Sequence, residues 1–177
     1  MFIIQEINII KYNINMLDIE DFKKKLDKKA RLMGIDPGKK RVGIAISDEN
    51  KIIATPFTTI IKNDYLKFIS EIKAIYEENH IKGIIIGNPI NMDGSQSPSS
   101  QSAKDLATNL SKDVTENVTM WDERLSSQGA FNLSRELDVN VSKKVKKLDA
   151  NAAQFILQGA LDYLTKKNTW YDTLKGL

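Results

Sequence analysis

The order of apolar and polar residues predicts three successive strands followed by alternating helices and strands. Apolar and β-branched residues flank a turn that carries Pro37 and Gly38, which is the pattern of a β-hairpin with a longer loop. Further along, apolar residues recur at helical spacing, and one short run is almost wholly apolar, as in a parallel strand buried on both faces. The expected strands are 31–36, 42–48, 51–61, 82–87 and 118–122, and the expected helices are 63–79, 97–112, 126–137 and 149–166.

This order of elements predicts an α/β fold with a mixed five-stranded sheet and helices on both faces. The first, fourth and fifth strands can run parallel, so that their C-terminal ends meet at one rim, where open α/β sheets bind ligands. Pro56 favours an edge position for the third strand, because proline cannot donate to a central ladder. Gly34 and Gly43 would weaken ordinary strands, so they indicate the close approach of another backbone or of a ligand.

The composition of the chain limits the kinds of functional site that it can contain. The chain has 177 residues, no cysteine and a single histidine, which suits one domain, excludes disulfides and argues against a zinc or iron–sulfur site. A formal net charge of +3 is mild, so binding to nucleic acid would have to come from local clusters of basic residues. No apolar run approaches the roughly 20 residues of a membrane span, and no signal peptide is evident. We expect a cytoplasmic protein.

Acidic residues stand at the predicted rim. Asp36 ends the first strand, Asp122 and Glu123 end the fifth, and Asp149 opens the last helix. Each has a purely structural alternative, in which Asp36 caps the hairpin and Asp149 is an acid favoured by the helix dipole. Together, however, carboxylates from three elements suit a hard divalent cation, and paired Mg²⁺ ions about 3.5–4 Å apart can hydrolyse a phosphodiester without a histidine. Strand alternation lets only one of Asp122 and Glu123 point into the site, and the longer side chain favours Glu123.

Basic residues surround these acids. A lysine run is ordinarily a solvated loop, but its position beside candidate metal ligands favours contacts with a phosphate backbone. The candidate nucleic-acid-binding residues are Lys39, Lys40, Arg41, Arg124, Lys143, Lys144, Lys146 and Lys147.

Four segments resemble the YqgF family, also called RuvX. They are Gly34 to Asp48, Gly87 to Gly94, Asp122 to Ser126 and Leu148 to Ala153. The family comprises bacterial nucleases with an RNase H-like fold, first described as candidate Holliday-junction resolvases and later as processors of the 5′ end of precursor 16S rRNA. The resemblance implies the strand order 3-2-1-4-5 with strand 2 antiparallel. It also implies that Asp36, Glu123 and Asp149 are the catalytic residues and hold Mg²⁺ or Mn²⁺. One departure is Asn88, where relatives commonly have leucine.

The resemblance also divides the chain. We expect an N-terminal extension at 1–30, the nuclease domain at 31–166 and a tail at 167–177, and Met16 is an alternative start. The expected function is metal-dependent endonucleolytic cleavage of structured nucleic acid, with precursor 16S rRNA as the favoured substrate. Two alternatives stay open, a Holliday-junction-resolving DNase and a non-catalytic nucleic-acid-binding module. The oligomeric state, monomer or homodimer, is open as well.

Overall fold

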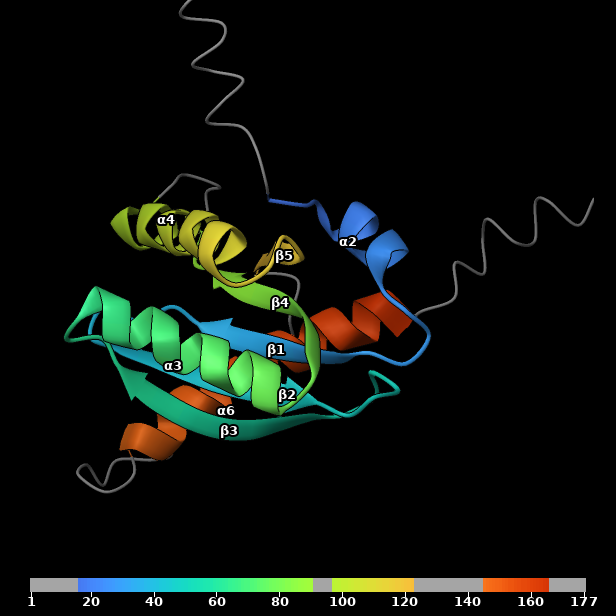
Figure 1. Cartoon of the computed structure of the whole chain (residues 1–177), viewed down its shortest axis with the longest axis horizontal. Helices are drawn as coiled ribbons and strands as arrows, with labels where there is room; N and C mark the ends of the chain where they lie inside the picture. The colour runs from blue at the N-terminus through green and yellow to red at the C-terminus, as the bar shows by residue number, and fades with distance from the viewer. Residues whose placement is uncertain (1–15, 91–96, 123–144, 166–177) are drawn as a thin grey trace, which may run out of the picture.

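The structure, a computed structural model, describes residues 16–90, 97–122 and 145–165, with side chains from residue 149 onward in the last range. Its centre is one five-stranded sheet in the order β3-β2-β1-β4-β5 (Figure 1). The pairs β1–β2 and β2–β3 are antiparallel, whereas β4 is parallel to β1 and to β5. This is the expected RNase H-like order. The strands are β1 (Arg31–Asp36), β2 (Arg41–Ser47), β3 (Ala54–Ile61), β4 (Ile81–Asn88) and β5 (Val118–Asp122).

Helices cover both faces of the sheet, with α3 in front of it and α6 behind it in Figure 1. Alternate strand residues point to opposite faces, and the buried side chains accordingly form two clusters. Met33 and Ile35 of β1 pack with α3 and α4, whereas Leu32 packs with α6 and α2. The described helices are α2 (Ile19–Lys25), α3 (Tyr65–Glu78), α4 (Pro98–Asp113) and α6 (Val145–Thr165).

Two helix starts differ from the prediction. Helix α3, expected from residue 63, begins at Tyr65 and is capped by Asp64, whose carboxylate accepts a hydrogen bond from the Lys67 N–H at 2.9 Å. The last helix begins at Val145 instead of Asp149. Asp149 therefore opens the second turn, and the idea that it is a first-turn acid favoured by the helix dipole is wrong. The helix expected at 126–137 lies outside the described residues.

The segment before β1 packs on the α6 side of the sheet. Phe22 of α2 is fully buried, and a Cβ added at Gly83 would lie 2.6 Å from its ring. Leu17 forms a parallel bridge with Thr119 beside β5, which extends the sheet at that edge. Within the part of the chain that the structure describes, no helix is long and apolar enough to cross a membrane.

Candidate active site

Two glycines let α6 contact the sheet directly. A Cβ added at Gly34 would lie 2.6 Å from Cβ of Leu157 and 3.0 Å from the carbonyl oxygen of Ala153. A Cβ added at Gly43 would lie 1.9 Å from the carbonyl oxygen of Asp149. Any side chain at these two positions would push the helix away. The close backbone approach predicted for both glycines is therefore confirmed.

Gly43 also brings Asp36 and Asp149 to one place. Asp36 is paired with Gly43 across the antiparallel β1–β2 ladder, and such partners lie on the same face with Cα atoms roughly 4.5–5.5 Å apart. Asp36 is two residues beyond Gly34, which also faces α6. Because the main chain of Asp149 lies against Gly43, the two acids meet on the α6 side of the rim. Both are half-buried.

The carboxylate of Asp149 has an unusual environment. Its Oδ2 atom is buried and accepts no hydrogen bond within the described residues. The Nε atom of Arg41 lies 2.9 Å from this oxygen, so the contact is an ion pair by distance without the alignment of a hydrogen bond. A buried carboxylate oxygen with unused lone pairs is costly. The same oxygen is well suited to a divalent cation, because hard cations prefer carboxylate ligands.

The third candidate ligand cannot be placed. Glu123 lies outside the described residues, and within the described part of the chain no three His, Cys, Asp or Glu side chains form a group able to hold a metal. Asp122 is described and lies level with Asn88 on the neighbouring strand. Asn88 accepts a hydrogen bond from the Ser100 hydroxyl of α4 at 2.8 Å, whereas Trp121 packs on the α6 side. Asp122 therefore lies on the α4 side, away from the other two acids.

The departure at Asn88 has a structural role. Besides the contact with Ser100, the loop that follows β4 is tied to α4 by Ser97, whose hydroxyl donates to the Pro89 carbonyl at 3.0 Å. The same hydroxyl accepts from the N–H of Ser100 and so caps the helix. Leucine at position 88 could not make the hydrogen bond to Ser100. Asn88 thus links the end of β4 to the start of α4.

The basic candidates divide into two groups. Lys39, Lys40 and Arg41 are exposed in and beside the β1–β2 loop, next to Asp36. The others are not described as side chains: Arg124, Lys143 and Lys144 fall outside the described residues, and Lys146 and Lys147 are placed only as backbone in the first turn of α6.

The pairing of Arg41 with Asp149 was not predicted from the sequence. Arg41 was assigned to the nucleic acid, whereas in the structure it contacts a candidate metal ligand. A signal was present in the sequence, because Arg41 stands two residues before Gly43 and therefore shares its face of β2. Choosing Asp149 as the partner, however, requires knowing that α6 contacts that face.

Two solved RuvC structures are among those to which the chain is similar. The RuvC protein of Thermus thermophilus in complex with a Holliday junction substrate superimposes with a TM-score of 0.46 and 9% identity, over 76% of this chain and 94% of that chain. Free RuvC from the same organism gives a TM-score of 0.45 and 9% identity, over 75% and 95%.

Sequence relatives are much more similar. A protein of Pelagibacter ubique is 57% identical over 149 residues, which is 84% of this chain and 99% of the relative. A protein of Novosphingobium aromaticivorans is 42% identical over 133 residues, 75% and 85% of the two chains. Both carry the name "Putative pre-16S rRNA nuclease". A sequence model described as "RuvX: Holliday junction resolvase" matches residues 30–163. The chain therefore belongs to the RuvX (YqgF) family.

Proposed function

We propose that the chain is a metal-dependent endonuclease that hydrolyses phosphodiester bonds in structured nucleic acid and trims the 5′ end of precursor 16S rRNA. The observation that carries the proposal is the meeting of Asp36 and Asp149 across Gly43 at the rim of the sheet. The name of the relatives, one of them 57% identical over almost its whole length, supports the substrate. We also propose that the enzyme acts in the cytoplasm, where ribosomes are assembled.

Asp36, Glu123 and Asp149 are the proposed catalytic residues and metal ligands. Asp36 and Asp149 are the two that lie together in the described part of the chain, and Asp122 lies on the opposite face, which supports Glu123 as the third. Bound as a pair, Mg²⁺ or Mn²⁺ supplies an activated water and charge stabilisation for the leaving oxygen. The protein contributes a fixed geometry, because both described acids are carried by a strand and a helix in direct contact.

The basic residues are proposed to hold the phosphate backbone. Lys39, Lys40 and Arg41 lie beside Asp36 in the β1–β2 loop, so a backbone bound there would pass the two acids. Cationic side chains fix the register of a nucleic acid without reading its bases. The further members of the proposed track are Arg124, Lys143, Lys144, Lys146 and Lys147.

Replacing one ligand tests the proposal. Asp36→Asn keeps the shape of the side chain but removes the charge that holds the cation, so Mg²⁺-dependent cleavage of a precursor 16S rRNA fragment should fall at least about 100-fold. Measured without divalent metal, binding of the RNA should change by less than about twofold, since the phosphate contacts are separate from the carboxylates. Glu71→Gln, on the exposed side of α3, is the matched control and should cleave normally. Undiminished cutting by Asp36→Asn would refute the mechanism.

A second candidate function follows from the description of the family model, Holliday junction resolvase. Cleavage of a four-way DNA junction and of precursor rRNA should be assayed side by side with Mg²⁺ and with Mn²⁺. A resolvase makes paired cuts and needs a two-fold dimer, so a monomer that cuts only RNA would exclude it. A non-catalytic binding module would show no heat of Mg²⁺ or Mn²⁺ binding in calorimetry.

A further inference from the structure

The ion pair between Arg41 and Asp149 suggests a role for Arg41 before any metal binds. The Asp149 oxygen that it approaches is buried and accepts no hydrogen bond within the described residues. The side chain of Asp149 is 21% exposed and that of Arg41 is 43% exposed. The guanidinium therefore reaches from the surface to a largely enclosed carboxylate. It supplies the positive charge that this buried oxygen would otherwise lack.

A metal ion bound to this carboxylate oxygen would compete with the guanidinium for it. A divalent cation such as Mg²⁺ binds a carboxylate oxygen at about 2.0–2.1 Å, whereas the Nε atom of Arg41 is 2.9 Å from the same oxygen. Two positive groups held this close in a partly buried site repel each other strongly. Arg41 is also the first residue of β2 and is exposed, so its side chain can swing toward solvent without disturbing the core.

We propose that Arg41 is the stand-in cation of the metal-free site, and that metal binding releases it to bind a phosphate of the nucleic acid. The inference rests on the proposed metal site and adds a regulatory step to it. Without metal, Arg41 holds Asp149 in position and is unavailable to the substrate. With metal, the freed guanidinium joins Lys39 and Lys40 at the phosphate backbone. Metal and nucleic acid then bind with positive coupling, typically 5- to 150-fold for coupled sites.

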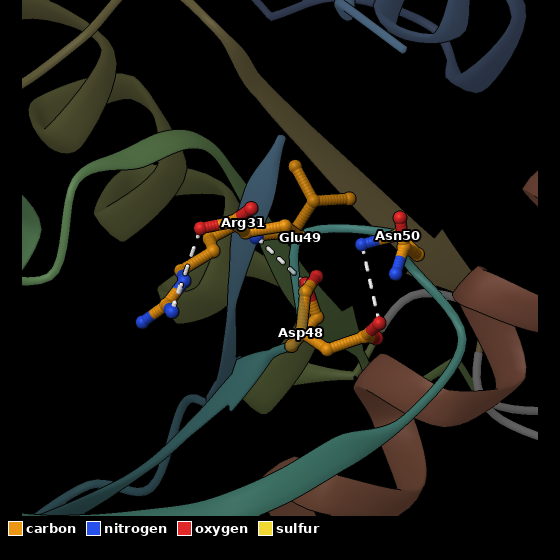
Figure 2. A network of polar contacts seen from close by, with 6 residues as sticks. Arg31, Asp48, Glu49 and Asn50 are labelled. Carbon is orange, nitrogen blue, oxygen red and sulfur yellow. Dashed lines mark hydrogen bonds and ion pairs between the residues drawn. The ribbon is translucent and has the colours of Figure 1, made fainter. Parts of the chain in front are cut away.

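The structure offers a matched control in Arg31. Like Arg41 it opens a strand and has a similarly exposed side chain, 42%, and it forms an ion pair with Glu49 at 3.7 Å. Figure 2 shows this pair beside the turn in which Asp48 accepts a hydrogen bond from Asn50. Arg31 lies at the other end of the sheet, so Arg31→Gln removes the same charge without touching the proposed site.

Calorimetry with Ca²⁺ on the full-length chain at pH 8 is the first test. Arg41→Gln should bind Ca²⁺ at least about fivefold more tightly than the unchanged protein, because no ion pair has to be broken. Arg31→Gln should bind it within twofold of the unchanged protein. The gain in RNA affinity on adding Ca²⁺ should also shrink severalfold in Arg41→Gln and persist in Arg31→Gln.

NMR of the arginine Nε–H groups follows the release directly. The signal of Arg41 is assigned by its loss in Arg41→Lys, a variant that keeps the charge and so preserves the fold if Arg41→Gln does not. In the unchanged protein the chemical shift of this signal should change on Ca²⁺ saturation, because the guanidinium leaves the carboxylate, while the signal of Arg31 should not change. If the unchanged protein and Arg41→Gln bind Ca²⁺ equally and the Arg41 signal does not change, this inference is overturned, but the proposed metal site is not. Absence of any Ca²⁺ or Mg²⁺ binding by the unchanged protein would overturn both it and the metal site.

Discussion

At the scale of single residues, the missing side chain of Gly43 decides where Asp149 lies. A Cβ there would come 1.9 Å from the Asp149 carbonyl oxygen, an atom of the main chain that cannot turn aside. Gly43→Ala should therefore displace the first described residues of α6. We expect a loss of about 1–3 kcal/mol in the free energy of unfolding, typical of overpacking, and a weaker affinity for Ca²⁺, both measured on the same sample by denaturation and calorimetry.

Gly34 supplies the comparison for this prediction. Its added Cβ would meet Leu157 and Ala153, farther along α6 from the acids. Gly34→Ala should lose a similar amount of stability but retain more of the metal affinity. Equal effects of the two substitutions on Ca²⁺ binding would show that Gly43 has no special part in placing Asp149.

Asp48 gives a prediction for pH dependence. Hydrogen bonds from the N–H groups of Ile53, Ile52 and Asn50 hold the pKa of its carboxyl below the ordinary 3.8. A lowered folded-state pKa stabilises the protein above 3.8, and this contribution disappears as the pH falls through the folded-state pKa. Unfolding experiments between about pH 2 and pH 4 should therefore show a shallower loss of stability in Asp48→Asn than in the unchanged protein. If stability fell equally steeply with pH in both proteins, the proposed contribution of Asp48 would be wrong.

Residue-level prediction singled out two acids that the structure brings together, and their role as metal ligands stays a prediction. Asp36 and Asp149 were chosen because they were expected at the ends of elements, although Asp149 lies in the second turn of its helix. It failed where the phase of a helix matters by one residue. In α3 the spacing of Tyr65, Ile69 and Ile72 predicts one buried face, but Tyr65 is 41% exposed and Phe68 is buried with the two isoleucines. Both Tyr65 and Phe68 are apolar residues at helical spacing from the buried isoleucines. Only the packing of α3 on the sheet shows which of the two is buried.

At the scale of elements, Phe22 is the buried side chain by which α2 packs on the sheet. Phe22 has no exposed surface, lies against Gly83 and packs in one cluster with Leu32. Phe22→Ala should lower the free energy of unfolding by about 3–5 kcal/mol, as for other buried phenylalanines. Leu66→Ala, at a side chain that is 77% exposed, should cost under about 0.5 kcal/mol. Similar melting curves for the two variants would mean that α2 contributes little to stability.

Element boundaries were least predictable where a side chain, and not a neighbouring strand, accepts hydrogen bonds from backbone N–H groups. The third strand was expected from residue 51 but begins at Ala54. The Asp48 carboxylate accepts from the N–H groups of Ile52 and Ile53, and Lys51 has a φ of 61°. These residues therefore form a turn, although their apolar sequence resembles a strand. Nothing in the hydrophobic pattern distinguishes the two outcomes.

At the scale of the whole molecule, a net charge of +3 leaves binding to depend on where the basic residues lie. Lys39 and Lys40 lie at the rim, whereas Lys28 and Lys82 are equally exposed at the other end of the sheet. The double variant Lys39→Gln/Lys40→Gln should reduce the slope of log affinity against log salt by about 1.4–1.8, or 0.7–0.9 for each lost phosphate contact. The variant Lys28→Gln/Lys82→Gln should leave the slope unchanged in filter-binding or anisotropy titrations.

The topology could be predicted almost entirely from the sequence. The hairpin, the edge strand with Pro56 and the buried parallel strand each restrict the sheet, and the family resemblance supplied the order that the structure confirms. The division of the chain at residues 30 and 166 stays a prediction, as does the role of Glu123. Contacts such as Arg41 with Asp149 could not be foreseen, because they depend on how closely two elements approach in space.

The contact of α6 with Gly34 and Gly43 has a consequence for protein engineering. At Gly43 main chain meets main chain, so the spacing of the two acids does not depend on which side chains fill the rest of the interface. A designer could exchange much of the outward surface of the helix and retain the spacing. Transplanting the two acids onto another scaffold would succeed only if both glycines were transplanted with them.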